Sequence, residues 1–267
     1  MIAENRTLHT ASTGKTHRRA APASADPTPE TPVQAELASL PTDARSTAPA
    51  IPATEASAGL STDSASPLPD VSLPDAACTA PLPETPVMNE ALEHGRRVAA
   101  IAEVLFQDLA ELHKLDDVWG RRLLLAARFH DIGLAGGRKG HHKVSMRLIE
   151  EDLGLSMPDE DRPYVALLAR YHRKARPSRR HPRFAELKRR DREALRKTVA
   201  LLRIADALDC THSGVIKHLA VSVKKRKVLI ALQSLGDCSA ERERLREQGS
   251  LFSDVFKRNL ECVCLAG

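Results

Sequence analysis

The stretch Leu123-Leu124-Leu125-Ala126-Ala127-Arg128-Phe129-His130-Asp131-Ile132-Gly133 decides the fold of this chain. Its apolar run predicts a buried helix, and Gly133 is a suitable place for that helix to stop. His130 falls on the buried stripe at helical spacing, and Asp131 follows it directly. Neighbouring side chains point about 100° apart on a helix, but they converge on one ion if the helix ends beside them. A histidine alone on an apolar face is more often a hydrogen-bonded core residue, so a metal site requires further ligands.

The first third of the chain differs in composition from the rest. Residues 1–87 hold 13 of the 17 prolines, have no Phe, Tyr or Trp, and carry a net charge of −5, whereas the remainder carries +10. A segment with so little apolar surface to bury cannot offset the conformational entropy lost on ordering. We therefore expect residues 1–87 to form a disordered tail.

Targeting and redox signals favour a cytoplasmic protein. The chain begins with polar residues rather than the apolar stretch of a secretory signal, and no run of about 18 apolar residues predicts a membrane span. The cysteines are odd in number and lack the spacing of a zinc site, which favours reduced thiols. They are Cys78, Cys210, Cys238, Cys262 and Cys264.

Hydrophobic periodicity predicts a mainly helical fold of two parts after the tail. The expected helices cover 89–112 (with Asn89 as N-cap), 117–130, a segment after 141, a segment from 161, and 191–209. Beyond them, 221–223 and 228–232 predict strands, and 241–248 and 251–256 predict helices. The expected domains are a helical domain over 88–210 and a small α+β appendage over 211–267.

The predicted helices bring further metal-ligand candidates to the core. His94 lies beside the apolar stripe of the first helix, and His172 ends the fourth. Asp206 lies in an apolar seam of the fifth, where an unpaired carboxylate is costly unless a cation lies nearby. Arg203 is the alternative cation to a metal ion.

A glycine-rich loop leads His141 and His142 into the third helix. His142 lies three to four residues before the apolar set that contains Met146 and Ile149, so we expect it to face inward, while His141 sits at the helix start. One histidine of this pair is enough for a ligand. If both this loop and the fourth helix contribute, a second ion is accommodated.

Together these residues form a ligand set that independent core histidines explain poorly. The candidates are His94, His130, Asp131, His141, His142, His172 and Asp206. Imidazole and carboxylate ligands without thiolate suit Mn²⁺, Fe²⁺, Co²⁺, Mg²⁺ or Zn²⁺, and the sequence does not choose among them. We expect one or two divalent ions per chain.

Four stretches resemble the signatures of a known family: 125–133 (LAARFHDIG), 140–145 (GHHKVS), 169–175 (ARYHRKA) and 202–209 (LRIADALD). With His94, they are similar to the all-helical HD superfamily of metal-dependent phosphohydrolases. The resemblance is closest to the C-terminal HD domain of the exopolyphosphatase/guanosine pentaphosphate phosphatase (Ppx/GppA) family. It covers about residues 88–265.

The departures from that family bear on function. Polyphosphate chemistry in full-length members resides in N-terminal actin-like domains with glycine-rich phosphate loops, which this sequence lacks, so that activity does not carry over. Many members have lost ligands in the HD portion, whereas His94, His130, Asp131 and Asp206 are all present here. Residues 134–137 (LAGG) replace the carboxylate-rich stretch of ppGpp hydrolases, and the Gly-Tyr-Pro signature of cyclic-dinucleotide phosphodiesterases is absent.

The resemblance implies a metal-dependent phosphohydrolase acting on a phosphoanhydride or phosphoester of nucleotide or polyphosphate type. His130 and Asp131 would be catalytic, with hydroxide formed on the metal attacking the phosphate. The basic residues Arg173, Lys174 and Arg170 would grip that phosphate. The alternative is a non-catalytic module that binds polyphosphate or a nucleotide and regulates a separate actin-like phosphatase.

The sequence also bears on macromolecular partners. The basic segment 170–192 offers only Tyr171 and Phe184 for stacking and contains no nucleic-acid motif, which argues against a nucleic-acid partner. No membrane partner is expected, and a homodimer is compatible with the sequence.

Overall fold

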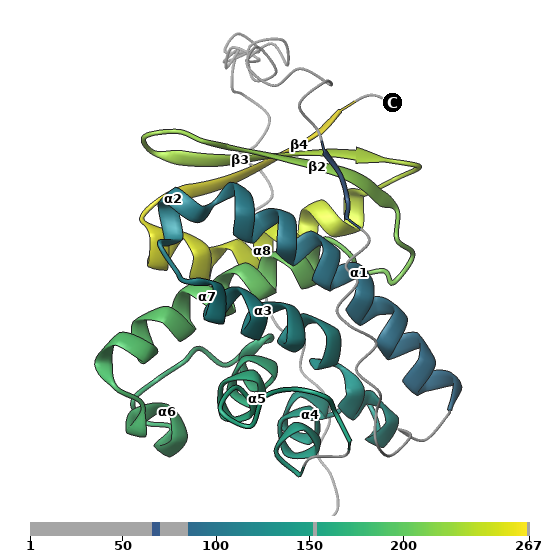
Figure 1. Cartoon of the computed structure of the whole chain (residues 1–267). Helices are drawn as coiled ribbons and strands as arrows, with labels where there is room; N and C mark the ends of the chain where they lie inside the picture. The colour runs from purple at the N-terminus through teal and green to yellow at the C-terminus, as the bar shows by residue number, and fades with distance from the viewer. Residues whose placement is uncertain (1–65, 70–84, 152–153, 266–267) are drawn as a thin grey trace, which may run out of the picture. The chain divides into compact units, whose positions relative to one another are not determined.

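The computed structural model describes residues 66–69, 85–151 and 154–265, which are mainly helical (Figure 1). The helices before the sheet are α1 (Pro86–Asp108), α2 (Ala110–His113), α3 (Asp117–Phe129), α4 (His141–Glu150), α5 (Arg162–Tyr171), α6 (Pro182–Glu186) and α7 (Arg189–Ala207). The C-terminal part contains β2 (Ile216–Val223), β3 (Lys227–Ser234), α8 (Ser239–Phe256) and β4 (Asn259–Leu265). This arrangement confirms the predicted fold class. None of the helices in the described ranges is long and apolar enough to cross a membrane.

Helix α7 is the central element of the helical part. It packs against α1, α3, α5 and α8. Its stripe of Leu195, Val199 and Leu202, at steps of four and three, is fully buried. This stripe fixes the rotation of α7 about its axis and so determines which way Asp206, four residues further on, points.

A glycine lets α1 and α3 cross closely. A Cβ added to Gly95 would lie 2.2 Å from the carbonyl oxygen of Arg128, so a larger residue does not fit between these helices. The neighbouring His94 on α1 is thereby brought to His130 at the end of α3, with ring centroids 5.1 Å apart. The crossing therefore determines the distance between two of the predicted ligands.

The first helix begins and ends earlier than the sequence predicts. Thr85 is its N-cap, and its hydroxyl oxygen accepts a hydrogen bond from the Met88 N–H at 3.2 Å. Pro86 occupies the first turn, where the missing N–H has no helical partner to lose. The prediction of Asn89 as N-cap is therefore wrong, because Thr85 followed by proline is the stronger start signal. The helix ends at Asp108, and α2 forms the separate last turn.

Gly133 does not end α3, contrary to the expectation from the sequence. The helix already ends at Phe129, and Gly133 lies in a 3-10 helix over Ile132–Gly136 without a positive φ. A Cβ on Gly133 would lie 2.4 Å from the His141 carbonyl oxygen and 2.5 Å from the Ser145 nitrogen. The glycine is needed for close approach to α4.

The C-terminal strands form a mixed sheet connected through α8. Strand β2 pairs antiparallel with β3, and β4 pairs parallel with β3, placing Val221 opposite Ile230 and Ile230 opposite Cys262. The predicted strands fall inside β2 and β3. The two predicted helices form one continuous helix, α8, because Gly249 continues the helix and leaves room for Leu260.

Only two short pieces of the predicted tail belong to the described residues. Ser66–Pro67 forms a two-residue strand, β1, antiparallel to β2, and the Leu68 N–H donates to the Lys217 carbonyl at 3.2 Å. Residues 85–87 begin α1. The rest of the tail lies outside the described residues, so its disorder stays a prediction.

The close crossing of α1 and α3 gives a stability prediction. In Gly95→Ala the new methyl group occupies the place of the Arg128 carbonyl, so the two helices have to separate. Overpacking of this kind costs about 1–3 kcal/mol. We expect urea denaturation to show a free energy of unfolding lower by about 2 kcal/mol, in the middle of that range.

Gly136→Ala is the matched control. Its Cβ would lie 3.7 Å from a methyl carbon of Val144, which is ordinary contact. Its free energy of unfolding should change by less than about 0.5 kcal/mol. Wild-type stability in Gly95→Ala would contradict the close crossing.

Candidate metal centre

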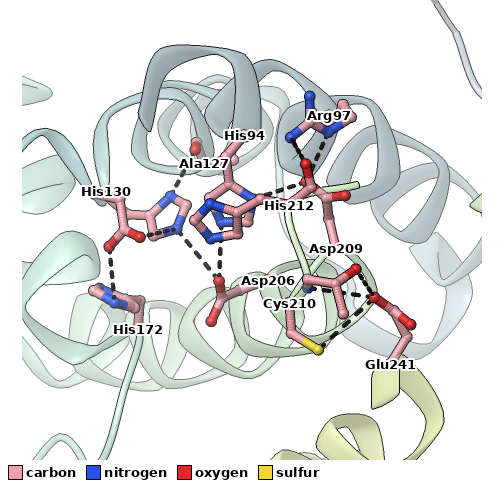
Figure 2. A network of polar contacts seen from close by, with 12 residues as sticks. His94, Arg97, Ala127, His130, His172, Asp206, Asp209, Cys210, His212 and Glu241 are labelled. Atoms are coloured by element: carbon pink, nitrogen blue, oxygen red, sulfur yellow. Dashed lines mark hydrogen bonds and ion pairs between the residues drawn. The ribbon is translucent and has the colours of Figure 1, made fainter. Parts of the chain in front are cut away.

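Four histidines and two aspartates from five helices meet in the core of the helical part. Figure 2 labels His94, His130, His172 and Asp206 among them. His94 comes from α1, and His130 and His172 are the residues at which α3 and α5 end. His141 is the first residue of α4. The rings of His94, His130 and His172 are fully buried, and that of His141 is nearly so. The helices thus place four imidazoles out of contact with bulk water.

Each of these imidazoles has its Nδ1 atom at a hydrogen-bond acceptor. The pairs are His94 with Asp209 Oδ2 at 2.8 Å, His130 with the Ala127 carbonyl at 2.8 Å, His141 with the Arg138 carbonyl at 2.9 Å, and His172 with the Ala169 carbonyl at 2.7 Å. A carboxylate or carbonyl oxygen only accepts, so Nδ1 is the donor in all four rings. A neutral ring then carries its lone pair on Nε2, which is the form that binds metals.

The four Nε2 atoms point toward two carboxylates. Asp206 Oδ1 lies 3.3 Å from Nε2 of His94 and 3.4 Å from Nε2 of His130. Asp131 Oδ1 lies 3.1 Å from Nε2 of His141 and 3.4 Å from Nε2 of His172. Two groups have ligand atoms within 4.8 Å of one another: His94, His130 and Asp131, and Asp131, His141 and His172. Asp131 therefore belongs to both.

The polar atoms at the centre are poorly satisfied by the protein itself. Nε2 of His130 and Oδ1 of Asp131 are buried and have no hydrogen-bond partner among the described residues. A buried polar atom without a partner is costly, and a lone pair facing a carboxylate is repelled by it. A cation between them removes both penalties. The residues present therefore fit a divalent ion with nitrogen and oxygen ligands.

Electrostatics keep the carboxylates ionised. Burial raises the pKa of Asp131, but His130, His141 and His172 outweigh this effect and hold the pKa below its ordinary value. Burial likewise opposes ionisation of Asp206, yet the imidazoles of His130 and His94 beside it hold its pKa well below normal. Both side chains are therefore negative at neutral pH, as cation binding requires.

The pKa values of the imidazoles shift in different directions, depending on the neighbouring groups. Burial and the charge of His130 together lower the pKa of His172 to about 3. Burial acts in the same direction on His94, but hydrogen bonds with Asp206 and Asp209 prevail and raise its pKa to about 9. Without a metal ion, His94 thus carries a compensating proton.

Arg203, the alternative partner for Asp206, is engaged elsewhere. Its Nε donates to the Tyr171 carbonyl at 2.9 Å and its Nη2 to the Ala175 carbonyl at 2.7 Å. The Asp206 side chain is 18 % exposed and makes its close contacts with His94 and His130. The hydrogen bonds of Arg203 therefore leave Asp206 to the histidine cluster.

The prediction that His142 faces inward is wrong. His141 is the buried residue of the pair, and His142 is partly exposed and outside both ligand groups. The sequence pattern predicted that Met146 lies on the buried face of this helix, but the buried positions of α4 are His141, Ser145 and Ile149. The Ser145 hydroxyl oxygen accepts a hydrogen bond from the Gly133 N–H at 3.0 Å, which explains a polar residue at this buried position. Because serine is polar, the hydrophobic pattern of the sequence did not include it in the buried stripe of α4.

Two residues of the loop after α7 also belong to the site. Asp209 is buried and accepts hydrogen bonds from His94 Nδ1 and from Arg97 Nε, both at 2.8 Å. The His212 ring stacks on His94 with a centroid distance of 3.9 Å and an interplanar angle of 13°. Asp209 belongs to the motif 202–209, three residues after Asp206, so the sequence contained a signal for it. No motif in the sequence indicated His212.

A pocket of about 520 Å³ opens over Asp131, His172 and Asp206. Its basic lining residues are Arg138, Arg173 and Arg244, from the loop before α4, the segment after α5, and α8. Of the predicted phosphate-binding residues, Arg173 lines the pocket, whereas Arg170 and Lys174 do not. Arg138 and Arg244 lie far from the basic stretch in sequence, so composition did not reveal them.

Comparison with known proteins agrees with the resemblance seen in the sequence. No curated protein matches the chain. Residues 90–248 match the family model for domain III of the Ppx/GppA phosphatases, and this range contains every residue of both ligand groups. The match confirms the closeness to the C-terminal part of that family. The chain thus belongs to the Ppx/GppA phosphatase family through its domain III.

Proposed function

We propose that this chain is an HD-type metal-dependent phosphohydrolase that acts on a phosphoanhydride or phosphoester of nucleotide or polyphosphate type. One observation carries the proposal: four buried imidazoles turn Nε2 toward Asp131 and Asp206 beneath a pocket lined by arginines. A buried ligand set next to an anion-binding surface is the combination that metal-assisted phosphate hydrolysis requires.

The ligand groups favour two neighbouring ion sites. His94, His130 and Asp131 would hold one ion together with Asp206, and Asp131, His141 and His172 would hold another. When bound, such ions polarise a phosphoryl oxygen and lower the pKa of water, so that hydroxide is available near neutral pH. We assign no ligand role to His142.

The side chains of the pocket would orient the substrate. Arg173 and Arg138 make no side-chain hydrogen bond or ion pair with other described residues, so their guanidinium groups are available to phosphate oxygens. Asp206 uses Oδ1 for its contacts with His94 and His130. Its Oδ2 has no hydrogen bond with a described residue and would accept one from the attacking water.

A second function is favoured by the pocket lining alone. Three arginines from separate parts of the chain would bind a polyanion whether or not hydrolysis follows. The chain would then be a regulatory module for polyphosphate or a nucleotide, acting with a separate phosphatase. The absence of turnover together with metal-independent binding would favour this alternative.

Metal content tests the proposed metal centre directly. Equilibrium dialysis against Mn²⁺, Co²⁺ or Zn²⁺, followed by elemental analysis, should give one or two bound ions per chain. Asp131→Ala should abolish binding because both groups share this carboxylate, whereas His141→Ala should remove only one ion. His142→Ala is the matched control and should retain the wild-type content. A protein that takes up none of these ions contradicts the metal centre.

Turnover separates the hydrolase from the binding module. Metal-loaded protein should release phosphate or a nucleotide from a member of a panel that includes polyphosphate, nucleoside polyphosphates, dinucleotides and simple phosphoesters. Asp131→Ala should reduce the rate to background while the circular dichroism spectrum stays that of the wild type. Wild-type turnover in Asp131→Ala would identify a contaminating phosphatase and end the catalytic assignment.

Substitutions of Arg173 and of its neighbour Lys174 test whether the pocket binds an anion. Arg173→Gln removes a charged donor from the pocket lining, and a charge-assisted hydrogen bond contributes about 1.5–3 kcal/mol. We expect inorganic phosphate to bind roughly 10- to 100-fold more weakly, as measured by calorimetry. Lys174→Gln, outside the lining, should change the affinity less than about threefold. Equal effects of the two substitutions would place the anion outside this pocket.

A further inference from the structure

A buried carboxylate from α8 lies at one end of the polar network in Figure 2. Glu241, in the first turn of α8, is 1 % exposed. Its Oε1 accepts hydrogen bonds from the backbone N–H of Thr211 at 3.3 Å, from the Thr211 hydroxyl, and from the Cys210 thiol at 3.9 Å. Burying a carboxylate costs free energy, so we expect the contacts of Glu241 with the loop after α7 to have a structural or functional role.

The loop that Glu241 holds is the loop that supports His94. Asp209 accepts the His94 Nδ1–H on Oδ2 at 2.8 Å and the Gly214 N–H on Oδ1 at 2.9 Å. On the other side of Thr211, the His212 ring lies flat against His94. Asp209 and His212 thus fix the orientation of His94 in two directions, one through a hydrogen bond and one through stacking.

The loop conformation has to be imposed by its surroundings. His212 has a φ of 58°, in the left-handed region that residues other than glycine rarely adopt. Such a residue persists only where neighbouring contacts hold it. Arg97 of α1 donates through Nη2 to the His212 carbonyl at 2.9 Å, and Glu241 of α8 holds the preceding residue, Thr211. The loop is therefore held from two helices.

We propose that Glu241 is a positioning residue of the metal centre, acting through Thr211 on the loop that carries Asp209 and His212, and through these two on His94. The effect on metal affinity rests on the proposed function. The effect on the His94 ring does not, because it concerns the metal-free protein.

The hydrogen-bond pattern makes the proposal specific. All three donors meet the same oxygen, Oε1, so the amide oxygen of glutamine could accept them equally well. Glu241→Gln should therefore preserve the position of the loop, and Glu241→Leu, which fills the space without an acceptor, should not. Thr211→Val removes the hydroxyl donor from the other partner and should act in the same direction as Glu241→Leu.

The first readout is the imidazole NMR signals of the metal-free, full-length protein. The hydrogen-bonded Nδ1–H signal of His94 should be kept in Glu241→Gln and shifted or lost in Glu241→Leu. The buried His113 ring, which is hydrogen-bonded to the Phe106 carbonyl at 2.7 Å, is the internal reference and should stay unchanged. Glu243→Gln, at an exposed neighbour on α8, is the matched control.

The second readout is metal affinity, measured by competition with a chelator. Loss of a residue that orients a ligand typically weakens binding about 10- to 100-fold. We expect that loss in Glu241→Leu for the ion of the His94 group only, with the ion of the His141 group unchanged. Glu241→Gln should bind both ions as the wild type does.

The outcomes separate this inference from the proposed function. A His94 signal that shifts in Glu241→Leu in a protein that binds no metal supports the positioning role and refutes the metal centre. An unchanged His94 signal in both Glu241→Leu and Thr211→Val overturns the positioning role, whatever the metal content. A Glu241→Gln protein that behaves like Glu241→Leu also overturns it, because charge rather than hydrogen bonding would then act. If Glu241→Leu does not fold, Thr211→Val decides alone.

Discussion

The buried carboxylate of Asp131 and the partly exposed carboxylate of Asp206 face four imidazoles whose Nδ1 protons are already donated elsewhere. The rest of the helical part is arranged around this electrostatic conflict. Neutral rings oriented in this way have no proton to offer the carboxylates, so added positive charge stabilises the cluster. In the metal-free protein, the raised pKa of His94 supplies a proton in partial compensation. A divalent ion would neutralise both carboxylates at once.

Helix ends explain how such a cluster is built in an apolar core. His130 and His172 each lie just after the last helical residue and donate to the carbonyl three residues earlier. Carbonyls in the last turn of a helix lack helical partners, so each histidine satisfies one of them while its Nε2 points beyond the helix. Gly95 contributes in another way, because its missing side chain lets α1 bring His94 close to His130.

The sequence was sufficient wherever periodicity and burial determine the outcome. The stripes of α3, α5 and α7 placed His130, His172 and Asp206 correctly because large apolar residues mark the buried faces of those helices. The choice between His141 and His142 failed because Ser145, a small polar residue, stands in the buried stripe of α4. Asp209, His212 and the arginines of α8 and of the loop before α4 belong to the site through tertiary contacts, which no local pattern encodes.

The same contacts bear on where the functional unit ends. A boundary after residue 210 separates Asp209, which orients His94, from His212, which stacks on the same ring. It also separates the ligand groups from α8, which supplies Glu241 to the loop and Arg244 to the pocket wall. The predicted appendage packs through α8 on α7, the helix that carries Asp206. Helices α1 to α7 alone would therefore keep the ligands but lose both a wall of the pocket and a support of His94.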